Sequence, residues 1–390
     1  GGATTSAAHT AIKIAPNYGG PVIHVLDASR SVPVVTSLLG EDSRNDFVLE
    51  NAKKHDEMRQ RYGPVKKNKK IISLEESRQN HFISDWEGIE IAEPIDRIRK
   101  ESFPLIEEII PYIDWSPFFH AWELRGRYPS IFDDAKCGDE AEKLYADAQL
   151  ILQKIIREKA FKACGVWEIF PANSVGDDIE IYTDQSRTNV RTIFHTLRQQ
   201  FTKDKKPNYA LADFVAPKSS GRQDFVGGFV VSIHGSDDLA SIYEKSNDDY
   251  SSIMTKALAD RLAEAFAEQM HSEVRQAWGY ERSGELSNED FIRERYRGIR
   301  PAPGYPAQPD HSEKAKLFEI LNAEEVTGAS LTESMAMSPG AAVSGLYFSH
   351  PESRYFGVGD IAKDQIEDYA KRKGVPLSVV EKWLGPWISY

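Results

Sequence analysis

Apolar residues recur at helical spacing in the longest amphipathic stretch of the chain. They fall four or five positions apart, as on one face of an α-helix, at Ile253, Leu258, Leu262, Phe266, Met270 and Val274. We assign the charged residues between them to the exposed surface, namely Lys256, Arg261, Glu268 and Glu273. The same spacing predicts helices over 103–113, 115–124 and 140–159, and two more near the C-terminal end.

Runs of β-branched and aromatic residues predict strands in the same part of the chain. These runs cover 165–170, 179–182, 209–215, 225–233, 342–348 and 354–361. They are separated by short turns and are partly segregated from the helices, which favours an antiparallel sheet over a parallel α/β fold. We therefore predict an α+β domain over 102–390, with a mainly antiparallel sheet flanked by helices.

The first 40 residues have a different pattern. A helix up to Pro16, a buried strand Val22-Ile23-His24-Val25-Leu26 and a second helix over 32–39 are predicted. One strand alone cannot pair both of its edges or bury both of its faces. We therefore interpret residues 1–40 as the C-terminal remnant of a doubly wound α/β domain that belongs to a longer chain.

Residues 41–101 are predicted to be a helical linker and a lead-in to the large domain. The stretch from Asp42 to Tyr62 is polar with sparse apolar residues, and it runs into the basic cluster Lys66-Lys67-Asn68-Lys69-Lys70. We interpret this cluster as solvated linker, with docking of an acidic partner as the alternative. Ser73-Leu74-Glu75-Glu76 has the spacing of a capping box and predicts the start of a short helix.

Composition limits the class of protein. A chain of 390 residues, of which 41% are hydrophobic and 28% charged, is longer than one core usually supports, so a large domain and a smaller piece are expected. The net charge of −12 disfavours nucleic acid as a partner. No apolar run approaches the roughly 18 residues needed to cross a bilayer, so no membrane partner is expected. With Cys137 and Cys164 as the only cysteines and no signal peptide at the start, we predict a cytoplasmic location.

Several common catalytic motifs are absent from the sequence. It contains no P-loop, no G-x-G-x-x-G, no H-E-x-x-H, no C-x-x-C and no G-x-S-x-G. Gly357-Val358-Gly359 is interpreted as a turn at the end of a strand. His311 and His350 lie in loop segments, where structural hydrogen bonds are commoner than metal ligation. We therefore predict no catalytic side chain and no metal site.

The segment Gly298-Ile299-Arg300-Pro301-Ala302-Pro303-Gly304-Tyr305-Pro306 is the first candidate for ligand binding. Its prolines and glycines fix an extended loop whose backbone polar groups have no helical partners. Arg300 offers a bidentate fork for a carboxylate, and Tyr305 offers an aromatic face. A rigid turn between domains explains the same residues equally well.

Three further segments carry candidate ligand contacts. Tyr355 and Phe356 stand in tandem on a predicted strand, where one faces inward and the other outward. Asp114 precedes a helical aromatic stripe, so it is either a helix cap or a carboxylate beside an aromatic wall. Glu264 lies about one helical turn from Arg261, where a solvated ion pair is the alternative. The sequence spacing does not establish that these segments converge.

Many segments together resemble one family, in its order and approximate spacing over essentially the whole chain. They include Gly1-Gly2-Ala3-Thr4-Thr5-Ser6, Asp27-Ala28-Ser29-Arg30, Tyr112-Ile113-Asp114-Trp115, Phe170-Pro171-Ala172-Asn173, Leu197-Arg198-Gln199-Gln200, Asp213-Phe214-Val215-Ala216-Pro217, residues 300–306 and Leu331-Thr332-Glu333-Ser334. The chain resembles the C-terminal third of cobalamin-dependent methionine synthase. On this resemblance, residues 1–40 are the tail of the cobalamin-binding domain, and residues 102–390 are the activation domain that binds S-adenosylmethionine.

The resemblance implies two sets of ligand contacts. The S-adenosylmethionine contacts fall on Asp114, Glu264, Arg300, Ala302, Tyr305, Tyr355 and Phe356. The family often has a tyrosine at the position of Phe356, so a stacking or backbone contact is expected there in place of a hydroxyl contact. A partial cobalamin site falls on Gly1, Gly2 and Ala28. The axial-ligand motif D-x-H-x-x-G and the folate region are missing, and zinc belongs only to the missing homocysteine region.

The resemblance also implies a function. The full-length enzyme is a methyltransferase that moves a methyl group from 5-methyltetrahydrofolate to homocysteine, and this chain is its reactivation module. The module presents the methyl group of S-adenosylmethionine for reductive methylation of cob(II)alamin. The implied partners are the cobalamin-binding domain of the same protein and a flavodoxin-like or diflavin reductase electron donor. Two alternatives remain, namely a free-standing reactivator of a separate corrinoid protein and an ordinary small-molecule methyltransferase.

Overall fold

The chain divides into two compact units, Gly1–Lys69 and Lys70–Tyr390. The computed structural model describes Ala7 and residues 10–25, 31–40, 44–62, 70–95, 98–204 and 206–390. None of the helices in these ranges combines the length and apolarity needed to cross a bilayer. The candidate cobalamin contacts Gly1, Gly2 and Ala28 lie outside the described residues, as do Lys66 and Lys67.

The described part of the first unit is helical. It contains a π-helical turn η1 (Thr10–Ile14), a 3-10 turn η2 (Ala15–Asn17), α2 (Ser31–Leu39) and α3 (Arg44–Tyr62). The predicted strand over 22–26 is wrong at residues 22–25, which form no strand. The Val22 carbonyl instead accepts a hydrogen bond of 2.9 Å from the Asn51 side chain on α3, so a side chain satisfies a group that a strand partner would satisfy in a sheet.

The second unit is built around a six-stranded antiparallel sheet, which confirms the predicted fold class. Its strands follow the order β4-β3-β2-β5-β8. Strands β1 and β3 pair with the same edge of β2, β1 at residues 165–168 and β3 at residues 172–175. Their bounds are β1 Arg99–Ser102, β2 Lys162–Val175, β3 Asp178–Tyr182, β4 Val190–His195, β5 Asp224–His234 and β8 Ala342–Tyr347. A two-stranded ribbon, β6 (Ser330–Leu331) with β7 (Met337–Ser338), lies apart from this sheet.

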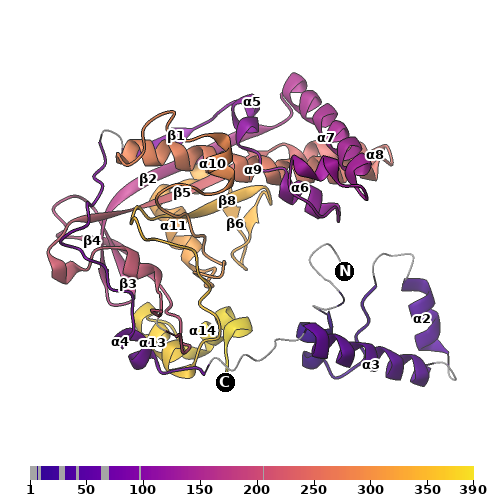
Figure 1. The fold of residues 1–390 in the computed structure, drawn as a ribbon, viewed down its shortest axis with the longest axis horizontal. Coiled ribbons are helices and arrows are strands. Elements are labelled where there is room, and N and C mark those ends of the chain that lie inside the picture. The colour runs from indigo at the N-terminus through magenta and orange to yellow at the C-terminus, as the bar shows by residue number, and fades with distance from the viewer. Residues whose placement is uncertain are drawn as a thin grey trace. The chain divides into compact units, whose positions relative to one another are not determined.

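Side chains alternate between the two faces of the sheet along β2 and β5, and each face packs against its own hydrophobic core. Trp167 on β2 and Phe229 on β5 face one core, which includes the long helix α9 (Asp249–Trp278). Val166 and Val230 face the other core, which includes α11 (Glu313–Leu321). Figure 1 shows α9 running along the sheet beside β2, β5 and β8.

Helix α9 approaches the sheet closely at Gly165 on β2. A Cβ atom at this position would lie 2.5 Å from Met270 Cε and 2.8 Å from Phe266 Cζ, both on α9. The helix begins after Asp248, whose side chain accepts from the Ser251 N–H at 3.0 Å, and ends at Gly279 in the left-handed conformation. The predicted long helix is confirmed and extends beyond the apolar stripe at both ends.

The remaining helices fall into two groups, those that share a core with α9 and those that lie elsewhere in the second unit. The core that contains α9 also takes in α5 (Ile106–Ile109), η4 (Ile110–Tyr112), α6 (Ser116–Ala121), η5 (Ser130–Asp133), α7 (Gly138–Glu158) and α8 (Ser236–Lys245). The other helices are α4 (Leu74–Gln79), α10 (Asn288–Ile292), α12 (Ala323–Thr327), α13 (Lys363–Lys373), α14 (Leu377–Leu384), and the 3-10 turns η6 (Leu211–Phe214), η7 (Lys218–Ser220) and η8 (Gly385–Trp387). Helices α4, α13 and α14 lie together at one end of this unit (Figure 1).

The predicted capping box is present at the start of α4. The Ser73 hydroxyl accepts from the Glu76 N–H at 3.1 Å, and the Glu76 carboxylate accepts from the Ser73 N–H at 3.0 Å. Two predicted strands are wrong. Residues 209–215 contain the turn η6, in which Asp213 accepts from the Ala210 N–H. Residues 354–361 form no strand, and within them only Ile361 makes an isolated bridge, to Ile388. Both segments have the apolar content of a strand, but neither is paired into the sheet.

Candidate functional site

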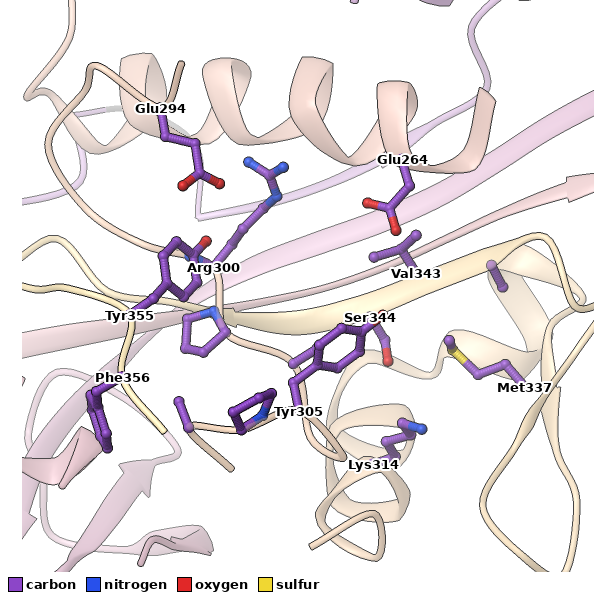
Figure 2. Close-up of a pocket in the computed structure, with 15 residues that line it drawn as sticks. Glu264, Glu294, Arg300, Tyr305, Lys314, Met337, Val343, Ser344, Tyr355 and Phe356 are labelled. Carbon is purple, nitrogen blue, oxygen red and sulfur yellow. The ribbon is translucent and has the colours of Figure 1, made fainter. Parts of the chain in front are cut away.

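A cavity of about 510 Å³ lies beside the sheet in the second unit. Its wall is formed by α9, by the proline-rich loop 300–307, by α11, by β7 and β8, and by the segment 355–356. Figure 2 shows side chains from these elements pointing toward one another. The lining residues are Glu264, Glu294, Arg300, Pro301, Ala302, Tyr305, Pro306, Ala307, Lys314, Met337, Ala342, Val343, Ser344, Tyr355 and Phe356.

The proline-rich loop is anchored to the end of the sheet. Ile299 and Phe348 exchange backbone hydrogen bonds of 3.1 and 3.0 Å, and the Leu346 N–H donates to the Pro301 carbonyl at 3.0 Å. Gly304 has φ +96°, and a Cβ there would lie 2.2 Å from the His311 ring, so only glycine fits. The loop therefore keeps a defined path along β8, and Arg300 and Tyr305 have fixed positions.

Arg300 is the most strongly held side chain of the cavity. Its Nη1 donates to the Glu268 carboxylate and, at 2.8 Å, to the Tyr296 hydroxyl. Burial, the largest single influence, would lower the pKa of Arg300. Glu268, together with Tyr296, Tyr355 and Tyr347, outweighs burial, and the pKa is raised well above its ordinary value. The guanidinium is a permanent cation at this wall.

The assignment of Glu268 to the exposed surface is wrong. Glu268 is 6% exposed and faces Arg300 from α9. Behind it, Arg275 is fully buried and bonds through Nε to the Glu281 carboxylate. Glu268 and Arg275 are seven positions apart, which puts them on one helix face, so polar residues repeated at helical spacing were the available signal. The sequence reasoning missed this second, polar face of α9 because it followed only the apolar stripe.

A buried histidine also lies beside the guanidinium. His271 stacks on the Tyr347 ring, with ring centroids 4.8 Å apart and an interplanar angle of 11°. Burial, followed by the charges of Arg275 and Arg300, lowers the pKa of His271 well below its ordinary value. His271 is therefore neutral and adds no positive charge to this wall.

Tyr355 and Tyr305 contribute aromatic surface and hydroxyl groups. The Tyr355 hydroxyl accepts a hydrogen bond of 3.1 Å from the Arg300 backbone N–H. Burial raises the pKa of both tyrosines, so both hydroxyls stay protonated near neutral pH. Phe356 packs against Tyr209, with ring centroids 5.7 Å apart, and closes the cavity without a hydroxyl. The two aromatics of the pair thus have different surroundings, although they do not lie on a strand.

Asp114 lies in an adjoining, smaller cavity of about 180 Å³. This cavity shares Glu264, Glu294 and Arg300 with the larger one, so the two are neighbours. The Asp114 carboxylate accepts from the N–H of Ser116, the first residue of α6, at 2.9 Å. The N-cap position itself belongs to Trp115, so Asp114 is not the helix cap, although it bonds to the first turn and also lines a cavity.

The structure brings the predicted residues together around one guanidinium. Those that line the larger cavity are Glu264, Arg300, Ala302, Tyr305, Tyr355 and Phe356, and Asp114 joins through the adjoining cavity. Glu294, which the sequence reasoning missed, lines both cavities, and burial raises its pKa. The two cavities together are lined by four carboxylates, by two guanidinium groups and by one lysine, so they offer both signs of charge to a ligand with a carboxylate and a cationic group. These residues are Asp114, Glu264, Glu268, Glu294, Arg261, Arg300 and Lys314. Within the described ranges, no group of three or more His, Cys, Asp or Glu side chains is arranged to hold a metal ion.

Comparison with known proteins supplies the family. The family model described as "Vitamin B12 dependent methionine synthase, activation domain" matches residues 105–374. The chain belongs to this activation-domain family. A solved structure described as "Crystal Structure of the MetH Reactivation Domain bound to AdoHcy" is similar to the chain, at 52% identity and a TM-score of 0.79, and the match covers 82% of this chain and 99% of that one. All the cavity residues of the activation domain fall inside the matched range.

A second charged cluster of the activation domain lies outside this cavity. Arg198 donates to Asp177 Oδ1 from Nε at 2.8 Å and from Nη2 at 2.6 Å, and to Asp213 Oδ1 at 2.7 Å. Arg78 on α4 donates to the other oxygen of Asp177 at 2.8 Å. All the charged groups at the centre of this cluster are paired with one another. We interpret the cluster as part of the framework that joins α4 to the sheet of the activation domain.

Proposed function

We propose that the cavity binds S-adenosylmethionine and that the chain presents the methyl group of this ligand for reductive methylation of cob(II)alamin. In this proposal the chain is the reactivation module of an enzyme that moves methyl groups from 5-methyltetrahydrofolate to homocysteine. The observation that carries the proposal is the convergence of Glu264, Arg300, Tyr305 and Tyr355 on one cavity. The 52% identical structure described as bound to AdoHcy supports it.

In this proposal, each side chain contacts a different part of S-adenosylmethionine. Arg300 binds the methionyl carboxylate, because a guanidinium fork matches a carboxylate in shape and charge. Asp114 and Glu264 both line the smaller cavity and balance the ammonium and sulfonium charges. Ala302, Tyr305, Tyr355 and Phe356 supply packing and stacking surface. Methyl transfer from a sulfonium releases no proton, so positioning suffices and no general base is required.

Besides this chain, the proposed reaction requires S-adenosylmethionine, cobalamin and an electron donor. Cobalamin supplies the cobalt that receives the methyl group, and an electron enters at the same time, so the products are methylcobalamin and S-adenosylhomocysteine. We propose that the cobalamin-binding domain of the same protein and a flavodoxin-like or diflavin reductase take part. We also propose that residues 1–40 are the tail of that cobalamin-binding domain and that residues 41–101 are a helical linker and lead-in to the activation domain over 102–390. The lead-in from Lys70, with α4 and β1, belongs to the second compact unit. Gly1, Gly2 and Ala28 remain the proposed cobalamin contacts.

Calorimetric titration of the chain with S-adenosylmethionine tests the proposal. Arg300→Ala is expected to weaken binding by about 1.5–3 kcal/mol, the usual value of a charged hydrogen bond. Arg300→Lys keeps a cation for Glu268 but loses the fork, and it is expected to weaken binding as well. Arg157→Ala, in an exposed ion pair with Glu158, is the control. Unchanged affinity in both folded Arg300 variants would contradict the carboxylate role.

A second assay tests the methyl transfer. The chain is mixed with a complementary fragment that carries cob(II)alamin, an electron donor and S-adenosylmethionine, and the absorption spectrum is followed. Appearance of methylcobalamin only when all components are present is the expected result. Binding of S-adenosylmethionine without any methylcobalamin would separate the ligand site from the proposed reactivation.

A further inference from the structure

Four charged side chains of alternating sign run from the interior of the second unit to the cavity wall. Arg275 bonds through Nε to Glu281, its Nη1 lies 3.8 Å from Glu268 Oε1, and Glu268 Oε2 accepts from Arg300 Nη1. The side chains of Arg275, Glu281 and Glu268 are 0%, 6% and 8% exposed, so water does not screen them. Each inner charge has an opposite charge next to it, which offsets the cost of burial.

Tyr296 bonds to the last two members of this row of charged side chains, Glu268 and Arg300. Its hydroxyl accepts from Arg300 Nη1 at 2.8 Å and donates to Glu268 Oε2 at 3.2 Å. The Arg275 guanidinium lies 3.9 Å from the centre of the Tyr296 ring, so the same tyrosine also contacts the next cation. One edge of the Arg300 guanidinium is thereby held by two partners, and both partners are themselves held.

The other edge of the guanidinium is left for a ligand. Among the described residues, no hydrogen-bond partner engages Nε or Nη2 of Arg300, whereas Nη1 contacts Glu268, Tyr296 and, at 3.5 Å, His271 Nδ1. Arg300 lines both the larger and the smaller cavity. We propose that Glu268 is a positioning residue, which holds Nη1 so that the Nε–Nη2 edge of Arg300 is oriented to receive the carboxylate of the ligand. This inference rests on the proposed binding of S-adenosylmethionine.

The proposal predicts a loss that depends on the ligand carboxylate. In Glu268→Gln, the charge between Arg275 and Arg300 is gone, and the two guanidinium groups repel each other across a buried space. Arg300 then leaves the orientation that suits the carboxylate. The affinity for S-adenosylmethionine should fall about tenfold or more, whereas the affinity for decarboxylated S-adenosylmethionine should change less than about twofold.

The experiment measures both affinities by calorimetry, with matched controls. Glu273→Gln removes a carboxylate of the same helix that pairs with Lys100 at 2.6 Å and lines neither cavity, so both affinities should stay unchanged. Tyr296→Phe keeps all charges and removes the hydroxyl between Glu268 and Arg300. It should give a smaller loss of about threefold, again only for the ligand with a carboxylate. This second variant tests the proposal even where Glu268→Gln does not fold.

The outcomes separate the two proposals. If the unchanged chain binds neither ligand, the proposed function fails and this inference fails with it. If the unchanged chain binds S-adenosylmethionine but the folded Glu268 variant binds it equally well or more tightly, only the positioning role is overturned. Equal losses for both ligands would also overturn it, because they would show that Glu268 supports the fold of the site rather than the orientation of Arg300.

Discussion

The backbone N–H of Arg300 donates to the Tyr355 hydroxyl over 3.1 Å. These two residues are 55 positions apart and belong to two loops without strand pairing at the contact. The hydrogen bond therefore joins the proline-rich loop to the segment that carries Tyr355 and Phe356. It helps to set the width of the cavity, at whose wall Arg300 and Tyr355 lie next to each other (Figure 2). The Arg300 side chain is held separately by Glu268.

Tyr355→Phe should weaken ligand binding without unfolding the domain. The substitution removes the acceptor for the Arg300 N–H but keeps the aromatic surface. We expect S-adenosylmethionine affinity to fall by about 1 kcal/mol, and the free energy of unfolding to fall by no more than that. Calorimetry and urea denaturation measure the two quantities. Tyr390→Phe, which removes a hydroxyl bound to Glu381 at 2.8 Å near the C-terminus, is the control.

Substitutions of Asp114 should separate its hydrogen bond to the start of α6 from its proposed ligand role. Asp114→Asn keeps an oxygen that accepts from the Ser116 N–H, so the free energy of unfolding should change by less than about 0.5 kcal/mol. Because the charge that we propose balances the ligand ammonium is lost, affinity should fall by about 1–3 kcal/mol. Asp114→Ala should add a stability loss of about 1 kcal/mol. An Asn variant that binds as tightly as the unchanged chain would contradict the ligand role and leave only the hydrogen bond to the Ser116 N–H.

His350 should make stability depend on pH below neutrality. Its Nδ1 accepts from the Glu352 N–H, and its Nε2 is 2.8 Å from the Ser84 hydroxyl, an arrangement that suits the neutral ring. Burial, and then the charge of Arg297, lowers the pKa of His350 to about 4. Because the unfolded chain takes up the proton first, the free energy of unfolding should rise with pH between about 4 and 6.5.

The size of this rise can be measured against a variant. In His350→Gln the rise between those pH values should be smaller by about 1–2 kcal/mol, after allowance for solvent screening. Urea denaturation at a series of pH values gives the comparison. Substitution of the exposed His120 by Gln should leave the slope of the unchanged chain intact. Identical slopes in the His350 variant and the unchanged chain would contradict the neutral, buried state.

Arg198 should be the most costly single charge to remove from the framework. Arg198→Met leaves Asp177 and Asp213 buried and facing each other without the guanidinium between them. Loss of one partner from a buried ion pair costs about 3–5 kcal/mol. The matched control, Arg157→Met in an exposed pair, should cost no more than about 1 kcal/mol. Similar midpoints of urea denaturation in the two variants would show that the cluster contributes little to stability.

The sequence predicted the central elements of the fold because their patterns are long and strong. Helix α9 and strands β2 and β5 bury one or both faces, and burial selects apolar residues at the matching period. Strands β1 and β4 were missed, since Arg99-Lys100-Glu101-Ser102 is wholly polar and β4 stands at the edge of the sheet. A strand of this kind depends on its pairing partner, which local sequence does not specify.

The candidate site was predictable in part. The resemblance pointed to Arg300, Tyr305 and Tyr355, and the structure places them around one cavity. It did not point to Glu268 or Glu294. Glu268 looked like a surface residue because charged residues between apolar positions usually face water, and only the fold places Arg300 opposite it. Glu294 follows α10 in the left-handed conformation, with φ +49°. The residues around it do not predict this conformation.

The lack of a side chain at Gly165 limits which substitutions, natural or engineered, this position accepts. Met270 and Phe266 occupy the room where its side chain would be, and they belong to the same helix as Glu264 and Glu268. A larger residue at this position requires Met270 or Phe266 to move, so we expect it to displace α9, and with it the two glutamates, relative to loop 300–307. A single methyl group at position 165 is therefore expected to alter the cavity from a place that does not line it.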